Sequence, residues 1–247
     1  TYLVQEEKII LDALGSGSRH IDTARRYENE KMIGSALQQC GLPRRELFLT
    51  SKVWKTDLGY DKTMASFEAS LKDLQVQYLD LFLIHWTLPF LGASWRALEQ
   101  LYDEGAVRAI GVCNFLPQHL LHVLKTANTV PMIDQFEFHP GYPQYETLQF
   151  CQSRGIQAEA WSPLGRGRLL EDPLVLELAK KYGKSPAQIC LRFCLQNNVL
   201  PLPKSSAPQR MKANLDIFDF EIEQEDIYRL LTMPQTGWSG LHPEHFE

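Results

Sequence analysis

Two residues near the start of the chain could do chemistry together, the carboxylate of Asp22 and the phenol of Tyr27. Asp22 closes a short predicted strand and Tyr27 lies in the loop that follows. The two can share a pocket if strand end and loop face the same cavity, which would suit a phenol acting as proton donor. A surface tyrosine beside an acid that pairs with Arg25 or Arg26 fits the same residues. The pair alone therefore leaves both interpretations open.

A polar or ring-bearing residue stands at the end of each of seven predicted strands. Apolar runs at 20–22, 47–51, 79–84, 107–112, 132–136, 156–160 and 199–202 alternate with amphipathic segments, which favours a parallel sheet. At or next to their ends lie, in order, Asp22, Lys52, His85, Asn114, Gln135, Trp161 and Lys204. In a (β/α)₈ barrel the carboxyl ends of the strands converge on one rim, where active sites form. Seven such residues in phase favour a barrel.

Helices are predicted between these strands, at 5–14, 29–39, 60–74, 94–104, 116–127, 143–154, 173–182, 186–197, 208–218 and 224–231. Asn29 stands where it can cap the second helix, Pro117 lies in the first turn of the fifth, and Gly105 follows the fourth as a C-cap glycine. A doubly wound sheet remains an alternative. It is less favoured, because no Gly-x-Gly-x-x-Gly follows an early strand.

Composition limits the function classes. The chain has 247 residues, 44% hydrophobic and 22% charged, without a linker or charge run, so we expect one domain over 1–247. A net charge of −5 argues against a nucleic-acid partner, and no apolar run reaches membrane-spanning length. Five irregularly spaced cysteines predict no disulfide framework and hence a reducing, cytoplasmic location. Cys190 and Cys194 lack partners for a metal site, so we expect core packing and no metal.

Ordered blocks over nearly the whole chain resemble the aldo-keto reductase family. They are HIDTA at 20–24, Tyr27 with Asn29 and Glu30, TSKVW at 50–54, DLFLIHW at 80–86, GVCNF at 111–115, QFEFHP at 135–140, AWSPLG at 160–165, and LPKS at 202–205 with Arg210. The resemblance implies a (β/α)₈ (TIM) barrel that reduces aldehydes and ketones to alcohols with NADPH. It is stronger for the smaller microbial members than for the mammalian aldose reductases.

The resemblance also implies roles for four catalytic residues. Tyr27 would be the general acid that protonates the carbonyl oxygen as hydride reaches the carbon. A free tyrosine titrates near pH 10, so a nearby cation, Lys52, would lower the pKa of the phenol. Asp22 would hold Lys52 by a salt bridge. His85 would hydrogen-bond the carbonyl oxygen and orient the substrate.

The cofactor residues follow from the same resemblance. Cys113, Asn114 and Gln135 would lie against the nicotinamide carboxamide, Trp161 would stack on the nicotinamide ring, and Asp22 would complete this end of the site. The pyrophosphate and the 2′-phosphate with the adenosine would be held by Ser162, Leu164, Gly165, Lys204, Ser205, Arg210 and Asn214. A preference for NADPH over NADH would rest on Lys204 and Arg210.

The substrate pocket would be lined by Trp54 and Trp86, with His85, which favours apolar or aromatic small carbonyl compounds. The loop from Trp86 to Ser94 and the tail after Leu231 are short, which predicts an open cleft. We expect a monomer. In place of a usual serine the chain has Cys113, a weaker donor. Ala213 stands where an acidic residue often contacts the adenine, which predicts looser cofactor binding.

The start of the sequence departs most from the family pattern. A capping hairpin and a first barrel strand ending in Gly-Thr would precede Thr1, so we expect seven strands and two open edges. A non-catalytic protein that binds NADPH or a partner on the same barrel is the alternative function. The complete set of Asp22, Tyr27, Lys52 and His85 favours the enzyme.

Overall fold

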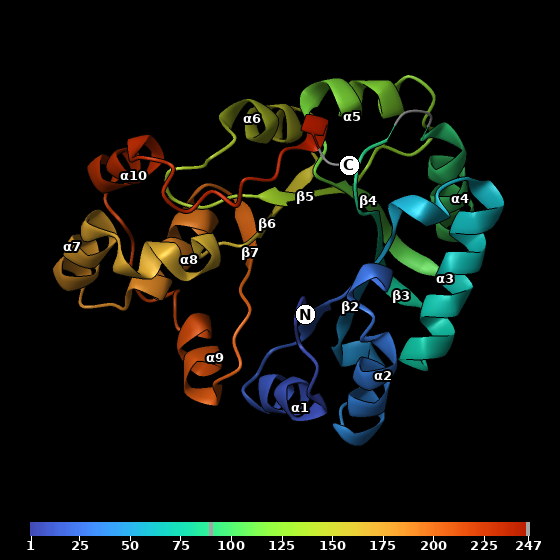
Figure 1. Ribbon diagram of the computed structural model, residues 1–247, viewed down its shortest axis with the longest axis horizontal. Coiled ribbons are helices and arrows are strands. Elements are labelled where there is room, and N and C mark those ends of the chain that lie inside the picture. The colour runs from blue at the N-terminus through green and yellow to red at the C-terminus, as the bar shows by residue number, and fades with distance from the viewer. Residues whose placement is uncertain (89–90, 246–247) are drawn as a thin grey trace.

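The computed structural model describes residues 1–88 and 91–245. One parallel sheet contains seven strands in chain order: β1 (His20–Asp22), β2 (Phe48–Val53), β3 (Leu79–Ile84), β4 (Val107–Cys113), β5 (Ile133–Glu137), β6 (Gln157–Trp161) and β7 (Val199–Leu202). The sheet curves into a nearly closed barrel with helices on its outside, and β1 and β7 are its edges (Figure 1). The prediction of a barrel of seven parallel strands is confirmed.

The helices follow the predicted alternation. They are α1 (Glu7–Gly15), α2 (Glu30–Gln39), α3 (Tyr60–Leu74), α4 (Gly92–Asp103), α5 (Pro117–Leu124), α6 (Tyr145–Ser153), α7 (Pro173–Tyr182), α8 (Pro186–Gln196), α9 (Pro208–Leu215) and α10 (Gln224–Thr232). Within the described ranges, no helix combines the length and apolar character needed to cross a membrane.

Most predicted boundaries agree with the structure, and five elements, β1, α3, β3, α7 and β7, match to the residue. Helix α9 ends at Leu215, three residues before the predicted boundary. Ile217 is nevertheless buried, and it reaches the core from the loop that follows the helix. The predicted side-chain cap by Asn29 is wrong: Nδ2 of Asn29 donates to the carbonyls of Thr1 and Val4. The predicted short loop from Trp86 to Ser94 includes positions 89 and 90, which lie outside the described residues.

Side chains on the two faces of the strands pack in two separate hydrophobic clusters. On β3, Phe82 and Ile84 pack in the large cluster shared with the helices. Leu81 and Leu83 point the other way and form a small interior cluster with Cys113, as the two-residue period of a strand requires. Glycine is needed at Gly111, because an added Cβ would lie 2.4 Å from a backbone oxygen of β5. The barrel interior beneath the strand ends is therefore closely packed.

Candidate active site at the carboxyl rim of the barrel

An ion pair lies at the carboxyl ends of β1 and β2. Lys52 is fully buried, and its Nζ donates to Oδ1 of Asp22 at 2.6 Å and to the carbonyl of Thr23 at 2.9 Å. Burial alone would lower the pKa of Lys52, but Asp22 and the nearby Tyr27 phenol raise it above its usual value. Burial alone would raise the pKa of Asp22, but Lys52 brings it down to about 2. Both groups are therefore charged at neutral pH.

The alternative partners of Asp22 are engaged elsewhere. Nη1 of Arg25 lies 2.5 Å from a carboxylate oxygen of Glu30 and 2.7 Å from one of Asp73. Arg26 is exposed, and its guanidinium lies 5.6 Å from the ring centre of Trp54. The interpretation of Asp22 as a surface acid paired with a neighbouring arginine is wrong.

Tyr27 and His85 lie beside this pair. Tyr27 ends a short 3₁₀ turn, η1 (Arg25–Tyr27), that leads out of β1, and Nζ of Lys52 lies 5.2 Å from its ring centre. His85 follows β3, and its ring stands edge-on to that of Tyr27 with 5.5 Å between ring centres. The ring of Trp54 lies 5.1 Å from His85 on centres. Three consecutive strands thus bring together all four predicted catalytic residues and one predicted wall of the substrate pocket.

Both rings are uncharged at neutral pH. Burial raises the pKa of Tyr27 to about 12, although the charge of Lys52 acts in the opposite direction. The expected lowering by Lys52 is thus present, but burial outweighs it and sets the net direction of the shift. Burial and the charge of Lys52 lower the pKa of His85 to about 3. Nδ1 of His85 is buried without a hydrogen-bond partner among the residues described. The site holds a protonated phenol and a neutral imidazole.

A second carboxylate approaches from the far side of the barrel. Nε2 of Gln135, on β5, donates to Oδ2 of Asp22 at 2.9 Å and to Oε2 of Glu159, on β6, at 3.0 Å. Sequence reasoning missed Glu159. A carboxylate between two alanines of a strand, two residues before Trp161 and so on the same face, was the signal that could have found it.

Asn114 and Trp161 form another pair at the rim. The indole N–H of Trp161 donates to Oδ1 of Asn114 at 2.7 Å, and Nδ2 of Asn114 donates to the carbonyl of His85 at 3.1 Å. Asn114 follows β4 with a positive φ of 62°. Its side chain therefore fixes the edge of the Trp161 ring and ties it to the loop that carries His85.

The remaining predicted cofactor residues lie on the two loops that continue β6 and β7 and on helix α9, which follows the second loop. The first loop turns sharply at Ser162, with φ 52°, and Gly165, with φ 54°, whose N–H donates to the carbonyl of Ser162 at 2.8 Å. In the second loop, Lys204 is exposed. Arg210, in the first turn of α9, is exposed as well, and its Nε lies 3.4 Å from Oγ of Ser205. Leu164 is half-buried next to Gly165, and Asn214 is half-buried near the end of α9.

Cys113 and Trp86 are both buried. Cys113 is buried in the interior cluster, and burial raises the pKa of its thiol well above the usual value, so the thiol stays protonated. Trp86 is 5% exposed directly after His85. Its role as a wall of the substrate pocket stays a prediction. Cys190 and Cys194 pack in the large core, as expected.

The tail after α10 is fastened to the barrel by Glu137, at the end of β5. Its two carboxylate oxygens accept from the N–H and Oγ of Ser239, at 2.9 and 2.6 Å. His139 is fully buried, and its Nε2 lies 3.2 Å from the same carboxylate. Trp238 stacks on Tyr142, 5.9 Å between ring centres. The short tail thus crosses the strand ends in a fixed path, and the open cleft stays a prediction.

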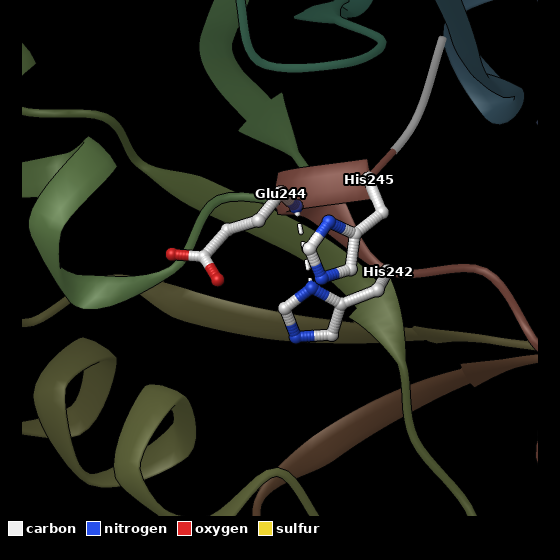
Figure 2. A group of neighbouring side chains, drawn as sticks. All are labelled: His242, Glu244 and His245. Atoms are coloured by element: carbon white, nitrogen blue, oxygen red, sulfur yellow. Dashed lines mark hydrogen bonds between the residues drawn. The ribbon is translucent and has the colours of Figure 1, made fainter.

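A possible ligand group lies further along this tail. Side-chain donor atoms of His242, Glu244 and His245 lie within 4.8 Å of one another. Figure 2 shows the two imidazoles facing each other while the Glu244 carboxylate points away from them. That carboxylate accepts from Nε2 of Gln118 at 2.8 Å, and Nδ1 of His242 accepts from the N–H of Glu244 at 3.3 Å. The hydrogen bond from Gln118 holds this part of the tail against α5.

Known proteins resemble this chain over nearly its whole length. The model of the aldo/keto reductase family matches residues 4–232. A glyoxal reductase of Bacillus subtilis is 47% identical, over 94% of this chain and 84% of its own. Among solved structures, an aldo-keto reductase from a Medee basin deep-sea metagenome library has a TM-score of 0.93 at 36% identity, covering 98% of this chain and 91% of its own. A variant of Gox0644 solved with NADPH has a TM-score of 0.91 at 36% identity, covering 98% and 89%.

Proposed function

Since this chain belongs to the aldo/keto reductase family, we propose that it reduces aldehydes and ketones to alcohols with NADPH. The observation that carries the proposal is the buried Asp22–Lys52 pair beside Tyr27 and His85. A proton donor, a cation and a neutral imidazole at one strand-end rim are the groups that carbonyl reduction requires.

The residues present fit NADPH. Trp161, held by Asn114, offers a ring for the nicotinamide, and the amides of Asn114 and Gln135 offer partners for its carboxamide. Lys204 and Arg210 are exposed cations that suit the 2′-phosphate. When bound, NADPH supplies the hydride that adds to the carbonyl carbon. The NADPH complex of the Gox0644 variant supports this choice of cofactor.

The proton comes from Tyr27. Its phenol is protonated at neutral pH and gives its proton to the carbonyl oxygen as negative charge develops there, which leaves a phenolate. Lys52, at 5.2 Å from the ring centre, stabilises that phenolate, and Asp22 keeps Lys52 in place. The neutral ring of His85 donates a hydrogen bond that orients the oxygen. Solvent then reprotonates Tyr27.

The substrate class follows from the walls of the site. Trp54 stands edge-on to His85 and offers an apolar ring beside the reacting group. A small aldehyde or an α-dicarbonyl compound fits such a wall, and the name of the Bacillus subtilis glyoxal reductase supports dicarbonyl substrates.

The test is NADPH oxidation in the presence of methylglyoxal or an aromatic aldehyde, by the parent chain and by Tyr27→Phe. Turnover should fall at least ~100-fold, because general-acid catalysis contributes about 10² to 10⁴. The NADPH dissociation constant should stay within a factor of about two. Tyr2→Phe is the matched control, since the ring of Tyr2 lies 5.4 Å from that of Tyr27. Equal turnover in Tyr27→Phe and parent would refute the assignment of the acid.

A further inference from the structure

The amide of Gln135 is held in one orientation. Its Nε2 carries two hydrogens, and the two acceptors within reach are carboxylate oxygens, of Asp22 at 2.9 Å and of Glu159 at 3.0 Å. Oε1 of Gln135 receives no hydrogen bond from any described residue and is not fully buried. An ionised carboxylate accepts hydrogen bonds but cannot donate them. Rotating the amide by 180° would therefore place the acceptor Oε1 against two carboxylate oxygens that are also acceptors. Oε1 is thus the end left for a ligand.

Burying the carboxylate of Glu159 at this position lowers the stability of the fold. It is 1% exposed, and its carboxylate makes no salt bridge in the described part of the chain. The ionisable groups that face it are Asp22, from β1, and Lys52, from β2, and its charge is also felt by the Cys113 thiol on β4. A buried carboxylate whose hydrogen bond comes from a neutral amide costs stability. A role in the site accounts for its presence.

We propose that Glu159 is a positioning residue of the cofactor site, whose carboxylate fixes the amide of Gln135 so that Oε1 faces the nicotinamide carboxamide as an acceptor. This inference rests on the proposed function. The acceptor end of Gln135 suits the N–H groups of a carboxamide, and a rotated amide would present N–H groups to them instead. Glu159 acts through Gln135 and does not itself touch the cofactor.

The fixed orientation of the Gln135 amide depends on the ionisation of Glu159. Burial raises the pKa of Glu159 to about 7, the hydrogen bond from Gln135 opposes this rise, and Asp22 adds to it. Once protonated, the carboxyl group can donate to Oε1 of Gln135, so only the ionised Asp22 still opposes rotation of the amide. NADPH should therefore bind more weakly as pH falls through about 7.

The experiment is fluorescence titration of NADPH at pH values from about 5.5 to about 8.5, which extends about 1.5 units to either side of that pKa. The proteins are the parent chain, Glu159→Gln and Glu159→Leu. At the alkaline end both variants should bind about tenfold more weakly, and the parent should approach them at the acid end. The 2′-phosphate also titrates near pH 6, but in parent and variants alike. The difference between the proteins is thus the measured quantity.

Two further variants isolate the mechanism. Glu99 is also a buried carboxylate, and it accepts from the N–H groups of Asn128 and Thr129. Glu99→Gln should leave NADPH binding and its pH profile unchanged. In a Gln135→Met background, Glu159→Gln should have no further effect, because its target is missing.

The outcomes separate the inference from the function it rests on. Equal affinity and an equal pH profile in Glu159→Gln and parent would overturn the role of Glu159, whatever the turnover. A parent chain that binds no NADPH would overturn both. Full turnover in Tyr27→Phe would overturn the proton donor and leave the binding result standing.

Discussion

Nζ of Lys52 lies 2.6 Å from Oδ1 of Asp22, with the lysine fully buried and the aspartate side chain 12% exposed. Neither group can be removed alone without leaving the other charge in a poorly solvated place. The pair therefore has a structural cost as well as the catalytic role proposed for it.

Lys52→Met should lower the free energy of unfolding by about 3–5 kcal/mol, because the charge of Asp22 loses its partner. Chemical denaturation at neutral pH measures the loss. Lys8→Met is the control: Lys8 pairs with Asp12, but its side chain is 74% exposed, and the change should cost under about 1 kcal/mol. Adding Asp22→Asn to Lys52→Met should recover part of the stability. A double variant less stable than Lys52→Met would contradict this explanation.

Glu159→Gln should stabilise the protein in alkaline solution. The folded-state pKa of Glu159, about 7, lies above its unfolded value, so its favourable contribution is complete below about pH 4.5 and is lost as pH rises through 7. The variant should gain roughly 3 kcal/mol over the parent above pH 7 and nothing at pH 4. The buried His20 and His85 titrate in the opposite sense, with pKa values lowered to about 4 and 3. Only the difference between the two denaturation profiles isolates Glu159.

Trp161→Phe should weaken NADPH binding without abolishing turnover. The substitution keeps an aromatic ring but removes the N–H that donates to Asn114 at 2.7 Å, so the dissociation constant should rise about three- to tenfold. Trp95→Phe also removes one indole hydrogen bond, to the carbonyl of Thr129 at 3.2 Å in a different part of the fold. It should lower stability and leave NADPH affinity as in the parent. Equal losses of affinity in both variants would argue against a specific role for Trp161.

Lys204→Ala combined with Arg210→Ala should reduce the preference for NADPH over NADH. Two exposed cations near Ser205 suit a 2′-phosphate, so NADPH affinity should fall ~10- to 100-fold while NADH affinity changes little. Raising the salt concentration should weaken NADPH binding to the parent more than to the double variant. If the parent chain binds both cofactors with equal affinity, these residues do not select the phosphate.

Ser239→Ala should loosen the tail. It removes the 2.6 Å hydrogen bond to the buried Glu137, at a cost of about 1–2 kcal/mol, and should speed limited proteolysis after α10. Ser153→Ala, which removes an exposed hydroxyl bonded to the carbonyl of Phe150, is the matched control. Identical cleavage rates in the two variants would show that Glu137 does not hold the tail.

Periodicity was enough to predict the sheet and the strand ends, because each strand carries a short apolar run and the helices between them repeat on one face. The meeting of Asp22, Lys52 and His85 follows from strand order alone. The Glu159 contact does not, since whether a carboxylate between two alanines of a strand faces Gln135 depends on the register of β5 against β6. The net pKa direction of Tyr27 was also out of reach, because burial is a property of the assembled barrel.

The hydrogen bond from Gln135 to Asp22 joins residues 113 positions apart, whereas every strand of the sheet pairs with its neighbour in the sequence. Neighbouring β-α units can therefore associate early, through short loops with a low entropy of closure. The hydrogen bond from Gln135 closes a much longer loop. It gives Oδ2 of Asp22 its donor only after the two halves of the chain have met. We therefore expect the contact between Gln135 and Asp22 to form late in folding, and recovery of NADPH binding should lag behind recovery of helical signal.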